Sequence, residues 1–369
     1  MTSRVHKGYV HRDGRVQIVD PDYGMLRLVR MVTPAFTIKS EPPPPDYQPR
    51  LGCTRRIVSD IRIDDLHAIN LPRLWDLHDS LVHESPHQGR PVGRATLLDI
   101  KQEVAERLMT DCRMCGHACG IDRFRERGRC GLLDEAVVDE LYVHIAEEPP
   151  VTPTAAIKIG GCALKCRECQ AHEALSRVSE GTKLGPSTFQ EIRTCDGFEE
   201  AVSLELVGGD PNESLFAILD ALSLSPEIPL PIIWNTHAYG SPDCYRLLDG
   251  VVDVYVPDMK GCNACLETYA AVRRYWDYAT AGVEAMLQQH ARVIVRLLVM
   301  AGHGSCCHEH AVRWLAQHRD RVWVSIYGLV PAWKRAMPVT SPDEVTRVEH
   351  LARGLGLRMI GESGGRFWI

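Results

Sequence analysis

The feature that most constrains the fold is a run of short apolar segments that alternate with helical segments from about residue 150. Six segments are rich in Val, Ile and Leu and have the length of buried strands: 155–160, 203–207, 231–234, 253–256, 293–300 and 322–327. Helical periodicity is found between them, at 213–224, 241–248 and 308–318. Strands that alternate with helices predict a parallel α/β sheet with right-handed connections and helices on its outside.

Candidate reactive groups follow the first four predicted strands directly. In strand order they are Cys162; Gly208, Gly209 and Asp210; Asn235, Thr236 and His237; and Asp258 and Lys260. Reactive groups of parallel α/β folds gather at the carboxyl ends of the strands. We therefore expect these residues to meet in one site.

Three cysteines, Cys162, Cys166 and Cys169, form a C-x3-C-x2-C loop after the first strand. Three thiolates on a short loop can bind three irons of a cubane cluster and leave the fourth iron without a protein ligand. The alternative is a zinc site that lacks one ligand, although zinc sites more often combine two distant C-x2-C pairs.

Four more cysteines, Cys112, Cys115, Cys119 and Cys130, lie within nineteen residues upstream of the predicted sheet. Four thiolates can complete a tetrahedral zinc site or bind one iron–sulfur cluster, and the spacing does not decide between them. We favour a structural role over a redox role for this segment.

Two further pairs of cysteines follow the fourth and fifth strands. The pairs are Cys262 with Cys265, and Cys306 with Cys307. They could jointly bind an auxiliary cluster, or they could be reduced thiols without a metal, and both interpretations stay open.

Composition limits the setting in which the chain works. The N-terminus has no apolar signal-peptide core, and no run of 18 apolar residues occurs, so we expect a cytoplasmic protein without membrane association. In a reducing compartment, fourteen cysteines are more readily metal ligands than disulfides. A net charge of −6 gives no broad basic field for nucleic acid.

Four regions are expected along the chain. Residues 1–105 form an accessory region with a hairpin signal at Asp13-Gly14, and residues 106–135 form the four-cysteine metal-binding segment. Residues 150–340 form the α/β domain, and residues 341–369 form a C-terminal helix and strand.

The cysteine loop, the Gly-Gly-acid motif and the six strand–helix units resemble the radical S-adenosylmethionine (SAM) superfamily. Within it, the chain is most similar to the pyruvate formate-lyase activating enzyme-like proteins. That similarity covers about residues 110–335 and rests on these motifs: 112–115, Glu147-Glu148-Pro-Pro, 206–211, 234–236, 252–260, His303 and Cys306-Cys307.

The resemblance implies a partial (β/α)6 barrel of the TIM type and a defined cofactor chemistry. Cys162, Cys166 and Cys169 would hold a [4Fe-4S] cluster that cleaves SAM reductively to a 5′-deoxyadenosyl radical, which abstracts hydrogen from a small-molecule, peptide or protein substrate. An electron donor such as flavodoxin or ferredoxin is implied as a partner. A glycyl-radical protein is one candidate substrate.

The resemblance also assigns cofactor-binding residues. Gly208, Gly209 and Asp210 match the motif that receives the SAM ammonium group. Four further residues match positions near the ribose and carboxylate of SAM: Asn235, Thr236, Asp258 and Lys260. Arg296 is also counted as cofactor-binding. Leu298 and His303 are placed beside the adenosine. The chain departs from the family pattern at Glu168, where an aromatic residue is usual, and at Asp210, where Glu is commoner. The rival interpretation is a zinc-stabilised binding module on the same barrel that has lost catalysis.

Overall fold

The computed structural model describes residues 9–12, 15–18, 50–86, 92–144, 147–148, 151–167, 169, 171, 178–329, 338–360 and 367–368. The Asp13-Gly14 turn and Glu168 lie outside the described residues. The two strands of the expected N-terminal hairpin, β1 (Tyr9–Arg12) and β2 (Arg15–Ile18), do pair antiparallel.

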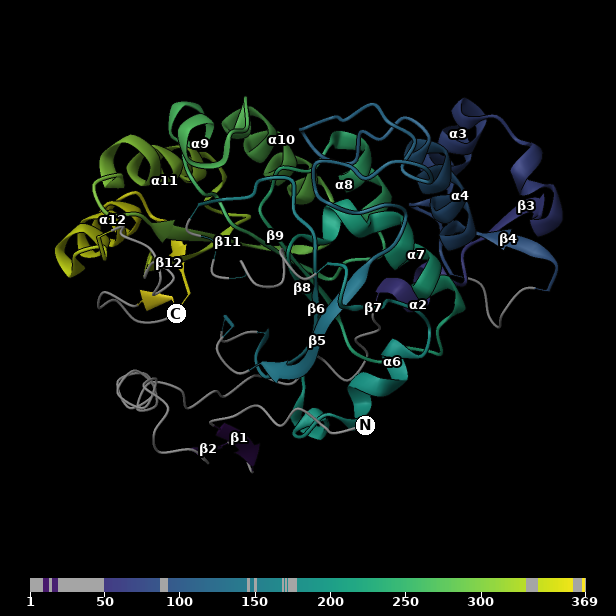
Figure 1. Ribbon diagram of the computed structural model, residues 1–369, viewed down its shortest axis with the longest axis horizontal. Coiled ribbons are helices and arrows are strands. Elements are labelled where there is room, and N and C mark those ends of the chain that lie inside the picture. Colours follow the sequence, from purple (N-terminus) through teal and green to yellow (C-terminus); the bar gives the residue numbers. More distant parts are fainter. Residues whose placement is uncertain are drawn as a thin grey trace.

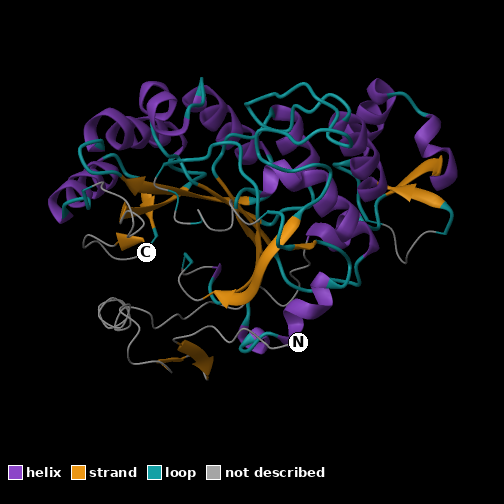
Figure 2. Ribbon diagram, viewed as in Figure 1, coloured by secondary structure: helices purple, strands orange, loops and turns teal. Residues whose placement is uncertain are grey.

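Six consecutive parallel strands form the centre of the main sheet (Figures 1 and 2). They are β6 (Thr154–Ile159), β8 (Ser203–Gly208), β9 (Ile232–Thr236), β10 (Val254–Pro257), β11 (Arg292–Val299) and β12 (Trp323–Leu329). Each predicted strand is present, with bounds that differ by at most two residues. The prediction of a mixed α/β fold with a largely parallel sheet is confirmed, and the strand order is consistent with a partial barrel.

Further strands extend the sheet at both ends. β5 (Val137–His144) pairs antiparallel with β6 and with β7 (Thr182–Lys183). At the other end, β13 (Arg358–Met359) and β14 (Phe367–Trp368) both pair parallel with β12. The sequence analysis did not predict β5, whose Asp139 and Glu140 interrupt its apolar pattern.

Helices lie along one side of the sheet, with α3 (Leu71–Leu81) and α4 (Leu97–Met109) at one end and α12 (Pro342–Gly354) at the other (Figure 1). They include α7 (Leu215–Leu224), α8 (Pro242–Leu248), α9 (Asn263–Ala270), α10 (Tyr275–Gln288), α11 (Glu309–Leu315) and α12 (Pro342–Gly354), with the short α6 (Thr188–Glu191). Ser241 and Ser341 begin α8 and α12 as N-caps, and a proline follows each serine. A serine cap before proline is a strong helix start, because the serine oxygen accepts an otherwise unpaired N–H.

Because successive side chains of a strand point to opposite faces, the two faces of the sheet carry different sets of side chains. Leu204, Leu206, Trp234, Val295 and Leu297 belong to the large core that the helices cover. The residues between them, among them Glu205, Asn235 and Arg296, therefore point to the opposite, inner face, because side chains alternate along a strand. The inner face thus carries buried polar groups within otherwise apolar strands.

The N-terminal region packs onto the same core. It comprises α2 (Arg50–Thr54), β3 (Val58–Arg62), η1 (Ile63–Ala68), α3 (Leu71–Leu81), β4 (Arg94–Thr96) and α4 (Leu97–Met109). A capping box of Thr96 and Asp99 starts α4, whose Leu98 and Ile100 are buried in the core shared with the sheet. Among the described helices, none is long and apolar enough to cross a membrane.

Candidate active site

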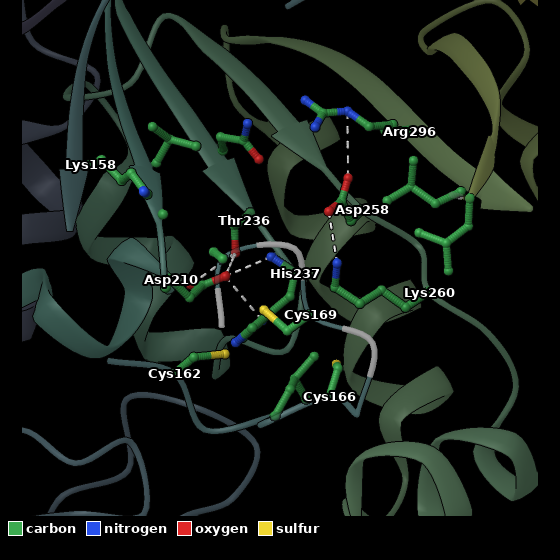
Figure 3. Close-up of a pocket in the computed structure, with 18 of the residues that line it drawn as sticks. Lys158, Cys162, Cys166, Cys169, Asp210, Thr236, His237, Asp258, Lys260 and Arg296 are labelled. Atoms are coloured by element: carbon green, nitrogen blue, oxygen red, sulfur yellow. Dashed lines mark hydrogen bonds and ion pairs between the residues drawn. The ribbon is translucent and has the colours of Figure 1, made fainter. Parts of the chain in front are cut away.

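A cavity of about 360 Å³ opens on the inner face at the carboxyl ends of the central strands (Figure 3). Its lining includes twelve of the thirteen residues predicted as catalytic or cofactor-binding: Cys162, Cys166, Cys169, Gly208, Gly209, Asp210, Asn235, Thr236, Asp258, Lys260, Arg296 and Leu298. The remaining one, His303, does not line it. In Figure 3 the three cysteines lie on one side of the cavity and Arg296 lies across from them.

The cysteine loop is held by three neighbouring parts of the chain. The Cys162 N–H donates to the Cys130 carbonyl (3.2 Å), and the Ala163 N–H donates to Glu213 Oε1 (3.2 Å). On the far side of the loop, the Arg167 N–H donates to the Tyr269 carbonyl (3.3 Å). These hydrogen bonds hold Cys162, Ala163 and Arg167 against neighbouring parts of the chain.

Burial controls the charge of the cysteine thiols. It raises the pKa of Cys166 to about 12, although the nearby Lys260 ammonium lowers it, and it raises the pKa of Cys162 well above its usual value. These thiols are neutral without a metal at physiological pH. A bound metal would deprotonate them and turn the loop into an anionic ligand set.

The spacing of the thiols bears on which metal they could hold. A tetrahedral zinc ion with Zn–S bonds of about 2.3 Å sets its sulfur ligands about 3.8 Å apart. The sulfurs of Cys162, Cys166 and Cys169, all of them described, do not lie within 4.8 Å of one another. A cubane cluster sets its thiolates wider apart because each binds a different iron. At least one pair of these three sulfurs is thus farther apart than the sulfur ligands of one zinc ion.

The Gly208-Gly209-Asp210 motif joins the ends of β6 and β8. A Cβ at Gly209 would overlap the Gly161 carbonyl, and Gly208 has a φ of +118°, which favours glycine. The Gly209 and Asp210 N–H groups donate to the carbonyls of Ile159 (2.7 Å) and Gly161 (2.9 Å). Both glycines are thus required for the close approach of two strand ends, in addition to any role toward a ligand.

Asp210 ties the end of β8 to the end of β9. Its buried carboxylate accepts hydrogen bonds from the Asn212 N–H (2.9 Å), the Thr236 hydroxyl (2.9 Å) and the His237 N–H (2.6 Å). Burial raises the pKa of Asp210 to about 7, and the neighbouring His237 opposes that rise. The carboxylate therefore organises this wall of the cavity whether or not it also meets a ligand.

His237 and Glu213 complete this wall. His237 was expected at this strand end but was given no cofactor-binding role, and Glu213 was not predicted. His237 Nε2 lies 3.2 Å from Glu213 Oε1, and both side chains are buried. Burial lowers the pKa of His237, but the carboxylates of Asp210 and Glu213 outweigh it and raise the pKa above the usual value. The position of His237 after Asn235-Thr236, at a strand end, was the sequence signal available.

The opposite wall holds a buried charge network around Arg296. Its guanidinium donates to Glu147 Oε2 (2.7 Å) and Glu148 Oε1 (2.9 Å), and it lies 3.5 Å from Asp258 Oδ1. Asp258 Oδ2 in turn pairs with Lys260 Nζ at 2.8 Å. Arg296 is thus surrounded by carboxylates of the chain itself, which positions Asp258 and Lys260 toward the cavity.

The network continues across the inner face and includes Glu205 and His144, which were not predicted from the sequence. Asn235 Nδ2 donates to Glu205 Oε1 (2.9 Å), and His144 Nδ1 lies 3.3 Å from Glu147 Oε1. Burial lowers the pKa of His144, but the neighbouring carboxylates of Glu147 and Glu205 outweigh it and raise that pKa to about 10. An acidic residue inside an apolar strand, as at Glu205, was the signal that could have found this network.

The upstream four-cysteine segment contacts the cysteine loop through Cys130 and the loop after β9 through Cys115. Cys115 forms an isolated bridge with Gly240, while the Cys130 carbonyl accepts the Cys162 N–H. The buried Arg123 donates to Cys112 Sγ (3.6 Å), and burial raises the pKa of Cys130 to about 11. All four cysteines of this segment are described, and no three of their sulfurs lie within 4.8 Å of one another. The segment is therefore not preformed around a single zinc ion.

His303, which the resemblance placed beside the adenosine, does not line the cavity and lies in another cluster. Its Nδ1 is 3.4 Å from Cys265 Sγ and 3.5 Å from Cys306 Sγ. The strand β11 ends at Val299, and the chain turns at Gly302 before it reaches the π-helical turn η6 (Gly304–His308). That turn directs His303 toward the two thiols.

The chain is similar, among others, to one protein in sequence and to one solved structure. No family model matches the chain. An uncharacterized protein of Methanocaldococcus jannaschii is 28% identical over 282 residues, which cover 73% of this chain and 82% of that protein. A radical SAM methyltransferase from Sphaerobacter thermophilus aligns in structure with a TM-score of 0.37 and 14% identity, over 55% of this chain and just under two thirds (65%) of that one. The functional proposal therefore depends on the residues of the site.

Proposed function

We propose that the chain is a radical SAM enzyme whose [4Fe-4S] cluster is held by Cys162, Cys166 and Cys169. The observation that carries the proposal is that three thiols of one strand-end loop line the same cavity as the polar strand-end groups of β8, β9 and β10. When bound, the cluster supplies one electron that breaks a C–S bond of SAM and yields a 5′-deoxyadenosyl radical. In this proposal the sheet is the partial (β/α)6 barrel of that superfamily.

The charges of the cavity suit a zwitterionic amino acid such as the methionyl end of SAM. Lys260 and Asp258 place a cation and an anion side by side at the cavity wall, 2.8 Å apart. The Lys260 ammonium is close enough to Cys166 to lower the pKa of that thiol. A ligand carboxylate beside Lys260 would therefore lie near the cysteine loop, and charge-assisted hydrogen bonds would orient it.

The apolar part of the lining has a separate role. Leu164, Leu298, Met300 and Leu329 also line the cavity and add apolar surface to it. Such a surface packs against an adenine ring and keeps water away from a reactive radical. The chain's contribution is thus to bind, orient and exclude water, while the cofactors supply the radical chemistry.

The motifs at Glu147-Glu148 and Asp258–Lys260 place the chain, in our proposal, nearest the pyruvate formate-lyase activating enzyme-like members of the superfamily. The two motifs have a shared structural role, because the carboxylates of Glu147, Glu148 and Asp258 surround the same Arg296 guanidinium. A flavodoxin or ferredoxin is the class of electron donor that this chemistry needs.

The rival zinc-stabilised binding module makes a different prediction for the metal content. We expect anaerobically purified and reconstituted protein to be brown, with iron and sulfide in the ratio of a [4Fe-4S] cluster and an electron paramagnetic resonance signal after reduction. Cys169→Ala should lose that signal, and Cys195→Ala, at a cysteine outside every cluster, should keep it. Colourless protein that contains zinc alone, with identical behaviour of both variants, would support the binding module instead.

A further inference from the structure

Three thiols and one imidazole converge in the loops and helices that follow β10 and β11, outside the cavity. Cys265 lies in the first turn of α9, His303 precedes η6, and Cys306 and Cys307 lie within η6. One ligand atom from each residue lies within 4.8 Å of all the others. Two segments that are 38 residues apart in the chain thus bring four metal-binding atoms to one point.

The distances within this cluster match those of a single tetrahedral ion. Cys265 Sγ is 3.8 Å from Cys306 Sγ, which is 3.6 Å from Cys307 Sγ. His303 Nδ1 lies 3.4 Å from Cys265 Sγ and 3.5 Å from Cys306 Sγ. Zinc bonds of about 2.3 Å to sulfur and about 2.05 Å to nitrogen give about 3.8 Å and about 3.5 Å for these separations. A polynuclear cluster requires thiolates that are farther apart.

We propose that Cys265, His303, Cys306 and Cys307 bind one Zn²⁺ ion. Three soft thiolates and one imidazole are a donor set that zinc prefers, and four protein ligands leave no open position for a substrate. The ion replaces the thiol protons of the three cysteines, which are released to solvent. The site is therefore structural, and neither a shared auxiliary cluster nor a set of free thiols describes it.

A fourth cysteine, Cys262, supports the site from outside. The Cys262 N–H points at Cys307 Sγ (3.4 Å), and such a donor stabilises a thiolate ligand. Cys262 Sγ itself is 3.7 Å from Cys307 Sγ but does not belong to the group of four mutually close ligand atoms. Cys262 is thus a matched control, since it is a neighbouring thiol that the proposal leaves unbound.

The ion would connect the loop after β10 to the loop after β11. A Cβ at Gly261 would lie 3.1 Å from Cys307 Sγ, so the residue that follows Lys260 packs directly against a ligand. The zinc site would therefore fix the backbone that carries Lys260 to the cavity. This proposal does not depend on the proposed radical chemistry, because none of its four ligands lines the cavity.

The test is zinc content per chain, measured by mass spectrometry on the full-length protein. We expect Cys306→Ser and His303→Ala each to lose one zinc per chain relative to wild type while the iron content is unchanged. Cys262→Ser should keep the wild-type zinc content. X-ray absorption at the zinc edge of wild type should include a shell of sulfur at about 2.3 Å with a shorter nitrogen contact.

Thiol labelling of wild-type protein gives a second readout that does not require the variants to fold. Cys265, Cys306 and Cys307 should resist alkylation until a zinc chelator is added and should then react together. Unchanged zinc in both ligand variants would overturn the proposal, as would loss of iron in place of zinc. Rapid alkylation of the exposed Cys306 before chelation would overturn it as well.

Discussion

Replacement of Arg296 tests the buried charge network most sharply. Arg296→Met keeps much of the side-chain volume but removes the cation among Glu147, Glu148 and Asp258. Arg296 is only 3% exposed, and Glu147 and Glu148 are at most 1% exposed. Removal of one partner from a buried ion pair costs about 3–5 kcal/mol, because the remaining charges stay buried without compensation. We expect a loss of that size in the free energy of unfolding at pH 8.

The loss should depend on pH in a defined direction. Burial raises the pKa of Glu148 to about 7, and Arg296 is the main group that opposes the rise, so Arg296→Met raises it further. A carboxyl whose pKa is higher in the folded state than in the unfolded state binds more protons when the chain is folded. Its contribution to the free energy of unfolding therefore falls as pH rises above the pKa of the unfolded chain, about 4.5. The cost of Arg296→Met should thus be smaller at pH 6 than at pH 8.

Chemical denaturation at the two pH values measures both effects. Arg274→Met is the control, because Arg274 forms an ion pair with Asp277 but its side chain is 72% exposed. Loss of an exposed pair should change stability by less than about 1 kcal/mol. If Arg296→Met costs no more than Arg274→Met, or if its cost grows as pH falls, the charge network does not have the role described.

Three further predictions concern single positions. Gly209→Ala should lower stability by about 1–3 kcal/mol in denaturation experiments, because its Cβ meets the fixed Gly161 carbonyl, whereas Gly354→Ala, with no atom within 4 Å, should not destabilise. Asp210→Ala should weaken SAM binding at least about tenfold by calorimetry and leave the iron content intact, and unchanged affinity would remove Asp210 from the site. Cys115→Ala should lower the melting temperature and remove the upstream metal while the reduced cluster signal of the cavity persists, whereas a stable variant without turnover would indicate a redox role for that segment.

The strands and the cavity could be predicted because both follow from local patterns. Continuous apolar runs mark buried strands, and residues such as Cys162 and Asp258 reach one site because parallel strands end at the same edge of the sheet. The Arg296 network could not be predicted in the same way. Arg296 and Glu148 are 148 residues apart. They meet because of the strand order in the sheet and because the alternation of side chains along β11 turns Arg296 to the inner face.

The place of His303 shows the same limit. Its position after β11 suggested the cavity, but the turn at Gly302 and the π-helical turn direct it toward Cys265. The pairing of Cys265 with Cys306 depends on how the loops after β10 and β11 lie next to each other. No spacing within either cysteine pair contains that information.

The formation of 5′-deoxyadenosine tests the central claim most directly. Reconstituted protein should release 5′-deoxyadenosine and methionine from SAM when dithionite supplies electrons, and liquid chromatography with mass spectrometry quantifies both products. Cys166→Ala should release neither, because two thiolates do not hold a cluster with one open iron. Production of 5′-deoxyadenosine by Cys166→Ala at the wild-type rate, or no production by wild type with its cluster intact and reduced, would contradict the assignment.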